Sequence, residues 1–264
     1  MNKLYFIVLL FSICEKLLAT NPPDAISLSL GGSTTAYSSP FCIQYNAANL
    51  VYSPSNIAFN AQNRYGIRDY TKILFVGNYS LKESSLGFSY QAENGIIFNQ
   101  KISAAIAKKI QPNLACGITL NLNRFSSRDS YYQNTQIITF SAGLSYQINP
   151  KNQLGFQIEN PNQSEIIAFP KGKLPTSVRL GLKHQLTSNI NLYIDAFQSS
   201  NQHINTCVGI EIIKDHYKIR TGYNTNQIIG CGIGIQKGSI MIDVGLSFHN
   251  HLGISPSLNT SYAW

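Results

Sequence analysis

The stretch LACGITLNLN at residues 114–123 alternates apolar side chains with small or polar ones without an exception. The same period of two returns in IGCGIGI at residues 229–235 and in IMIDVGLSF at residues 240–248. Successive side chains of a β-strand point to opposite faces of the sheet, so each stretch has one apolar face and one small or hydrated face. A soluble sandwich buries the apolar face, whereas a membrane barrel turns it to lipid. The environment of that face therefore decides the class of protein.

Strand patterns continue from residue 57 to residue 264, separated by turn signals. Most of the segments have about 8–12 residues, which is the length that a tilted strand needs to cross hydrocarbon. No segment keeps a 3.6-residue period, which argues against alternating strands and helices. The fourteen expected strands are 57–65, 71–80, 84–92, 96–107, 113–125, 134–147, 153–159, 176–186, 189–198, 204–213, 216–224, 227–236, 239–249 and 256–264.

Connection lengths and composition favour the membrane barrel. Tight joins such as residues 187–188 and 237–238 alternate with longer polar loops such as residues 123–135 and 160–175, an asymmetry typical of outer-membrane barrels. Charged residues make up 12% of the chain, about half the usual share of a soluble domain. The polar face of the strands is rich in Gly, Ser and Asn, which suits a crowded lumen. The predicted fold class is all-β, an antiparallel transmembrane barrel of about 14 strands with an N-terminal hatch-like plug.

The chain divides into three expected parts. Residues 1–19 have a charged start and a short apolar core, which indicates a cleaved signal peptide. Residues 20–56 are dense in Gly and Pro and contain only short apolar pieces, which favours a segment packed inside the barrel formed by residues 57–264. We therefore expect export to the outer membrane of a Gram-negative bacterium. The net charge of +8 is scattered, so anionic lipid headgroups are a better partner than nucleic acid.

The C-terminal strand predicts a partner during assembly. It ends on Trp264, with Tyr262 and Leu258 at alternating positions before it. An aromatic final residue in such a strand looks like the signal read by the outer-membrane insertion machinery. Soluble domains usually have a polar tail after their last strand. We predict that these three residues form a barrel-assembly signal.

No catalytic or metal site is predicted. The four cysteines that follow the signal peptide have no metal-binding spacing, and we expect no disulfide among them. His249 and His251 have strand spacing but no acidic or thiol partner nearby, so a polar rim is the expected role. No Ser/His pair or phosphate loop stands out, and no cofactor is expected. The cysteines are Cys42, Cys116, Cys207 and Cys231.

Charged residues on the polar face are expected to pair within the lumen. The acidic members are Asp195, Asp243, Glu159 and Glu211, and the predicted basic partners are Arg179 and Lys183. Buried charges need partners, so we interpret this network as structural and only secondarily as a conduction path.

The N-terminal segment carries a resemblance to a known family. Gly31 and Gly32, followed by IQYNAANL at residues 43–50, resemble the glycine pair and YNPAGL element of the FadL/PorV-like outer-membrane barrels. The proline of this element is Ala47 here and its glycine is Asn49. Spaced landmarks at 158–161, 174–182 and 251–255 look like those of the PorV/PorQ branch. The resemblance implies a fourteen-stranded barrel with an internal hatch, and its hatch-like motif here is Gly31, Gly32, Tyr45, Asn46 and Leu50.

The resemblance allows two functions. FadL-type members pass hydrophobic molecules through the barrel, whereas PorV and PorQ relatives act in type IX secretion as cargo-binding or surface-attachment components. The chain is short for a FadL transporter, and its loops lack an extended apolar rim. The prediction is therefore a non-catalytic PorV/PorQ-like component with secretion-system proteins or cargo as partners. The alternatives are a FadL-like channel for hydrophobic small molecules and a soluble exported β-sandwich. The sequence identifies no ligand.

Overall fold

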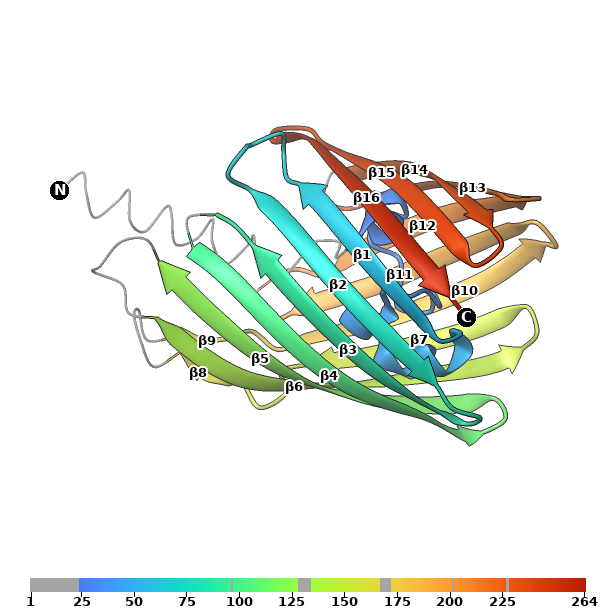
Figure 1. Cartoon of the computed structure of the whole chain (residues 1–264), viewed down its shortest axis with the longest axis horizontal. Coiled ribbons are helices and arrows are strands. Elements are labelled where there is room, and N and C mark those ends of the chain that lie inside the picture. Colours follow the sequence, from blue (N-terminus) through green and yellow to red (C-terminus); the bar gives the residue numbers. More distant parts are fainter. Residues whose placement is uncertain (1–23, 96, 128–133, 167–171, 201, 227) are drawn as a thin grey trace.

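Fourteen antiparallel strands close into a barrel in which each strand is hydrogen-bonded to two neighbours (Figure 1). The computed structural model describes residues 24–95, 97–127, 134–166, 172–200, 202–226 and 228–264, so the predicted signal peptide at residues 1–19 lies outside the described residues. Strands adjacent in sequence pair with each other, and β1 pairs with β16 to close the ring. In the part of the chain that is described, no helix is long and apolar enough to span a membrane.

The barrel strands coincide with the fourteen predicted segments, and the predicted fold class is confirmed. The largest differences are at β4, which continues to Gln111, and at β16, which begins at Gly253. A two-residue pair, β8 (Glu165–Ile166) with β9 (Gly172–Lys173), lies in the connection after β7 and was not predicted. The barrel strands are β1 (Asn56–Asn63), β2 (Thr71–Ser80), β3 (Ser84–Glu93), β4 (Ile97–Gln111), β5 (Leu114–Ser127), β6 (Thr135–Asn149), β7 (Asn152–Glu159), β10 (Ser177–Thr187), β11 (Ile190–Ser199), β12 (Asn205–Lys214), β13 (Tyr217–Asn224), β14 (Ile228–Lys237), β15 (Ile240–His249) and β16 (Gly253–Ala263).

The two ends of the barrel differ in their connections. At one end, which we call the turn end, adjacent strands are joined by tight turns such as residues 112–113 and 238–239. The same end holds the start of β1 and the end of β16, where the amide of Trp264 donates to the carbonyl of Ser55 over 2.9 Å. At the opposite loop end the connections are longer, as at residues 64–70 and 160–176.

The strands turn their apolar face outward. Ile118 and Leu120 of β5 are 57% and 56% exposed, although they are large aliphatic side chains. Between them, Thr119 points inward and is buried. The polar face is therefore the interior of this molecule, the reverse of a soluble sandwich, and the β-sandwich alternative is wrong for this fold.

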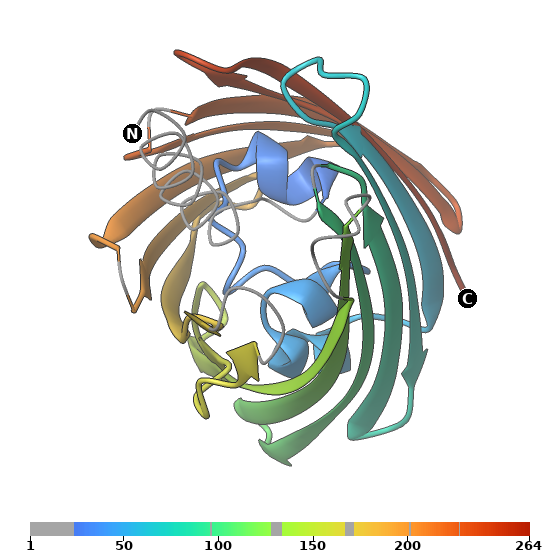
Figure 2. The same ribbon diagram turned by 90° about the vertical axis from the view of Figure 1, so that its left-hand side faces the viewer.

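The N-terminal residues 24–55 fill the lumen, and we call them the plug. Figure 2, which looks into the barrel, shows the plug helices inside the ring of strands. Helix α2 (Ala25–Ser29) packs against β13–β16, and the 3₁₀-helix η2 (Ala47–Tyr52) packs against β2–β6. A second 3₁₀-helix, η1 (Cys42–Gln44), precedes η2 and contacts it.

Short polar side chains begin the plug helices. The carboxylate of Asp24 accepts hydrogen bonds from the amides of Ile26 and Ser27 at the N-terminus of α2. The side chain of Asn46 does the same for the amide of Ala48 at the start of η2. These caps satisfy backbone donors that have no partner within so short a helix.

Glycines on the inner wall allow the plug backbone to approach the strands. A Cβ atom at Gly117 of β5 would lie 2.5 Å from the backbone nitrogen of Ala48, and one at Gly222 would overlap the backbone of Leu30. This contact explains why glycine is frequent on the polar face of the sequence. The inner-wall glycines that lie closest to plug backbone are Gly117, Gly155, Gly222, Gly230 and Gly245.

We predict that Gly117→Ala loosens the plug, because the added methyl group requires η2 or β5 to shift. Such overpacking typically costs about 1–3 kcal/mol. The temperature at which the folded, fast-migrating form is lost on a denaturing gel should fall by several degrees. The matched control is Gly77→Ala, since a Cβ at Gly77 meets nothing within 4 Å. Equal midpoints for the two variants would contradict the proposed contact.

Candidate functional site

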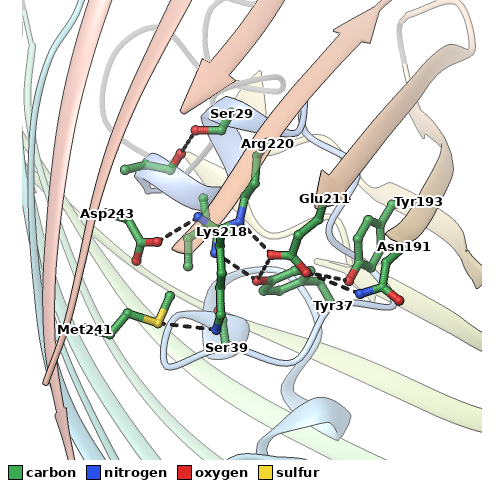
Figure 3. A network of polar contacts seen from close by, with 12 residues as sticks. Ser29, Tyr37, Ser39, Asn191, Tyr193, Glu211, Lys218, Arg220, Met241 and Asp243 are labelled. Carbon is green, nitrogen blue, oxygen red and sulfur yellow. Dashed lines mark hydrogen bonds and ion pairs between the residues drawn. The ribbon is translucent and has the colours of Figure 1, made fainter. Parts of the chain in front are cut away.

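A buried ion-pair network on the inner wall holds the plug at Tyr37 (Figure 3). Arg220 of β13 makes two contacts of 2.7 Å, from Nε to Glu211 Oε2 and from Nη1 to Asp243 Oδ1. The hydroxyl of Tyr37, which belongs to the plug, donates to Glu211 over 2.8 Å and accepts from Arg220 Nη2 over 3.3 Å. One plug side chain thus contacts both signs of charge in the network.

The network is almost fully buried and receives hydrogen bonds from several strands. Arg220 is 1% exposed, and the second oxygen of Glu211 accepts hydrogen bonds from Tyr193 over 3.3 Å and from Asn191 over 3.5 Å. Charges removed from water in this way are tolerated only when they are paired and hydrogen-bonded. The plug and the wall therefore satisfy each other's buried polar groups.

The observed partners differ from the predicted ones. The sequence predicted one network of Asp195, Asp243, Glu159 and Glu211 with Arg179 and Lys183, whereas the ion pairs of Glu211 and Asp243 are both with Arg220, which was not among the predicted residues. In YKIRTGYN at residues 217–224, Arg220 alternates with the outward-facing residues, so the sequence pattern already indicated that its side chain points into the lumen. The sequence had no corresponding signal for Tyr37, because its position depends on the path of the plug.

A second anchor joins Asp195 of β11 to the plug. Its Oδ2 accepts from the amides of Thr34 and Thr35, each over 2.9 Å, and from the Thr35 hydroxyl over 2.7 Å. The preceding glycines, Gly31 and Gly32, have φ values of 65° and 94°, a left-handed conformation that favours glycine. The glycine pair therefore makes the turn that brings these donors to Asp195.

A third anchor involves the other predicted hatch residues. Asn46 Nδ2 donates to the carbonyl of Thr35 over 2.9 Å and to that of Leu144 on β6 over 3.0 Å. Tyr45 is hydrogen-bonded to Ser39 within the plug, and Leu50 is fully buried in an apolar cluster. The structure places all five hatch-like residues in the plug, and their identification as a family motif stays a prediction.

A cavity of about 210 Å³ lies on the loop-end side of the plug, and we call it the vestibule. Plug residues including Gly32 and Tyr45 line its floor, and side chains from the strands line its wall. The wall residues used below are Lys72, Glu93, Lys101, Phe125, Glu159, Leu174, Arg179, Phe197 and Cys207.

The vestibule combines charge with aromatic surface. Lys101 of β4 reaches Glu159 of β7 over 3.3 Å, although β5 and β6 separate the two strands along the wall. The guanidinium of Arg179 lies 4.3 Å from the centroid of the Phe197 ring, a cation–π contact. Glu159 and Arg179, which the sequence assigned to one network with Glu211, therefore belong to a separate site.

The remaining predicted residues lie outside these sites. The rings of His249 and His251 are 6.2 Å apart, and in the described ranges no group of three or more His, Cys, Asp or Glu could hold a metal. The four described cysteines are free. At the C-terminus, Leu258 and Tyr262 face outward, and Trp264 stacks on Tyr262 with centroids 6.2 Å apart. Their role in assembly stays a prediction.

The fold is shared with hydrocarbon channels of known structure. The chain matches a CymD monoaromatic hydrocarbon channel with 12% identity and a TM-score of 0.70, over 91% of this chain and 97% of that one. It matches the Ralstonia pickettii toluene transporter TbuX with 12% identity and a TM-score of 0.69, over 92% and 98%. It matches the P. putida toluene transporter TodX with 11% identity and a TM-score of 0.73, over 92% and 99%. At these identities the similarity shows the fold alone.

No protein-family model matches the sequence, and a search of curated proteins found no match.

We predict that Tyr37→Phe increases opening of the plug at this position. The change removes hydrogen bonds to two buried charges, whose loss costs roughly 1–3 kcal/mol. Hydrogen exchange of the plug amides around residues 33–38 should become about tenfold faster. Tyr79→Phe, at an outward-facing and exposed tyrosine, is the control and should leave exchange unchanged. Unaltered protection in Tyr37→Phe would show that the network does not hold the plug.

We also predict that Asp24 makes plug stability depend on pH. Burial raises the pKa of Asp24 from 3.8 to about 6, against the lowering effects of the Asn259 and backbone hydrogen bonds and of Lys72. The folded pKa is above the unfolded one, so the folded state binds the proton more tightly. Stability is therefore highest below about pH 4 and falls until the pH passes about 6, by on the order of 3 kcal/mol.

Asp24→Asn should remove this part of the pH dependence, because asparagine keeps the cap without the charge. The measurement is the thermal midpoint of the folded barrel from pH 4 to pH 7. The difference between wild type and variant isolates Asp24 from other titrating groups. Parallel curves for the two proteins would refute the prediction.

Proposed function

We propose that this protein is a non-catalytic, FadL-like outer-membrane channel that admits small molecules with an apolar group, and that its plug gates the lumen. The observation that carries the proposal is the vestibule, which lies inside a closed barrel and ends on the plug. The shared fold with structures named as toluene and monoaromatic hydrocarbon transporters supports it.

The outer surface supports the membrane location. Large apolar side chains are exposed around the barrel. In water, a protein with such a surface would be prone to aggregate. Short turns face the periplasm and longer loops face outward in bacterial barrels, so we assign the turn end to the periplasm. In this orientation the vestibule faces the cell exterior.

The chemistry of the vestibule favours amphipathic substrates. Phe125 and Leu174 line the cavity with apolar groups, and Arg179 lies over the ring of Phe197. The cations of Lys72, Lys101 and Arg179 outnumber the carboxylates of Glu93 and Glu159. A pure hydrocarbon would displace water from these charges without replacing its hydrogen bonds, which costs free energy. An aromatic body with an anionic group matches the lining better.

Passage beyond the vestibule requires the plug to move. The plug occupies the lumen, and its polar anchors at Glu211, Asp195 and Asn46 bind the wall. The bonds to the carboxylates of Glu211 and Asp195 each contribute about 1.5–3 kcal/mol net and those of Asn46 about 0.5–1.5 kcal/mol, because water replaces them when the plug is released. Release of the plug would exchange these bonds for bonds to water and would also separate the apolar cluster around Leu50 and Leu74, whereas the barrel would keep its own interstrand hydrogen bonds.

A secretion role of the PorV/PorQ type is the second candidate. The observation that favours it is the same plug, because a cargo-binding component needs a closed wall and no pore. Lipid and the outer-membrane insertion machinery are proposed partners in both cases, and secretion components or cargo only in this one. Deletion of the gene separates the two roles. Loss of surface proteins with unchanged uptake of small molecules would favour secretion.

The sharpest test of gating tethers the plug to the wall. A Cβ atom at Gly32 would lie 3.5 Å from Cys207 Sγ, so Gly32→Cys can form a disulfide between the plug and β12. We expect uptake of 4-methylbenzoate by proteoliposomes to fall severalfold in the oxidised variant and to recover on reduction. Toluene serves as the comparison compound, because it has the same ring without the carboxylate.

The double variant Gly32→Cys/Cys207→Ser is the matched control. It has the same backbone strain at position 32 but cannot form the tether, so its uptake should not respond to reductant. Equal uptake by the oxidised and reduced single variant would refute plug gating. No uptake of either compound above protein-free liposomes would refute the channel function.

A further inference from the structure

We propose that the outer wall carries a binding site for the phosphate headgroup of an anionic lipid, centred on Arg124. The site goes beyond the proposed function and depends only on its placement of the barrel in a membrane. It is a groove of about 160 Å³ on the lipid-facing side of β3–β6, remote from the lumen. Its lining residues are Tyr90, Gln100, Ile102, Leu122, Arg124 and Gln136.

Strand register assembles the polar part of this groove. Gln100 of β4 is directly opposite Arg124 of β5, which in turn is opposite Gln136 of β6. All three side chains therefore lie in one row across the wall, with the guanidinium between two amides. Gln100 Nε2 also donates to the hydroxyl of Tyr90 on β3 over 3.0 Å.

The next row toward the turn end is apolar. It contains Ile102 and Leu122, which are opposite each other and face outward. The groove thus has guanidinium and amide donors at one edge and an aliphatic floor below them. If these donors bind the phosphate of a lipid, the acyl chains of that lipid lie along Ile102 and Leu122.

The depth of the row agrees with a headgroup. On β4, outward-facing Lys108 lies eight residues from Gln100, with Ile102, Ala104 and Ile106 between them on the same face. At about 3.3 Å per residue and a tilt of about 40°, this distance is about 20 Å across the membrane. It is close to the roughly 25 Å apolar band of such barrels. Lys108 and Arg124 therefore lie near opposite interfaces.

Arg124 is distinctive among outward-facing residues. Among the described barrel strands, Arg124 is the one charged residue whose side chain faces outward in the loop-end half of the wall. The outward-facing Lys108, Lys214 and Lys237 lie near the turn end. Arginine binds phosphate through two parallel hydrogen bonds, and an anionic lipid supplies the opposite charge at this depth. The row of donors, the aliphatic floor and the depth together select a lipid phosphate.

The test measures lipid binding by the detergent-purified, folded barrel. Monophosphoryl lipid A is titrated and retained lipid is counted by native mass spectrometry. We expect Arg124→Gln to weaken binding about ten- to a hundredfold, the usual loss for a charged hydrogen-bonded pair. Arg124→Lys keeps the charge without the paired donors and should give an intermediate loss. Arg68→Gln, in the loop of residues 64–70, is the control and should bind as wild type does.

The outcomes distinguish a lipid site from a site for free anions. Wild-type affinity in Arg124→Gln would overturn the proposal, as would equal competition by millimolar inorganic phosphate, which would indicate a free-anion site. Heat-modifiable migration of each variant confirms that it is folded. Uptake of 4-methylbenzoate should be unchanged in Arg124→Gln, so a failure of the channel function and a failure of this site give different results.

Discussion

The close approach of plug backbone to inner-wall glycines is the contact on which the rest of this structure depends. Without a side chain at Gly117 or Gly222, the plug lies directly on the strands and fills the lumen. A barrel whose apolar face is outward has no conventional core inside it. The plug supplies that interior, with an apolar cluster around Leu50 and Leu74 and polar anchors elsewhere. A methyl group at one of these glycines would separate the plug from the wall at that position.

Buried charge gives the interior its specificity. Arg220 is placed between Glu211 and Asp243, and the plug reaches the same network through Tyr37. Removing one partner of a buried ion pair leaves a charge that neither lipid nor apolar packing can solvate. Water, in contrast, can replace the plug's hydrogen bonds if it enters the lumen. This difference between the ion pairs of the wall and the hydrogen bonds of the plug is what the proposed gating requires.

The periodicity of the sequence predicted the barrel strands well, but it did not predict which side chains form pairs inside the barrel. Alternation, together with the turn signals between the segments, located all fourteen barrel strands. The predicted strand 96–107 ended too early, because β4 continues through Lys108 and Lys109 to Gln111. The β8–β9 pair was missed because two residues are too short to show any period. Parity showed that Glu211, Asp243 and Arg179 point inward, but parity contains no information on which strands face each other across the lumen.

The sequence by itself determined the strands and the two faces of each strand, because these follow from local alternation. Sparse charge, the asymmetry of the connections and the small residues of the polar face then favoured the apolar face as the outer one. Only the tertiary structure decided that Arg220 forms ion pairs with both Glu211 and Asp243, that Lys101 reaches Glu159 across two strands, and that Tyr37 and Asp195 bind the plug to the wall. These contacts depend on barrel closure and on the path of the plug, which bring together residues far apart in the chain. The vestibule and the Arg124 groove also depend on the tertiary structure. Barrel closure brings the side chains of the vestibule around one cavity, and the register between strands places those of the groove in one row.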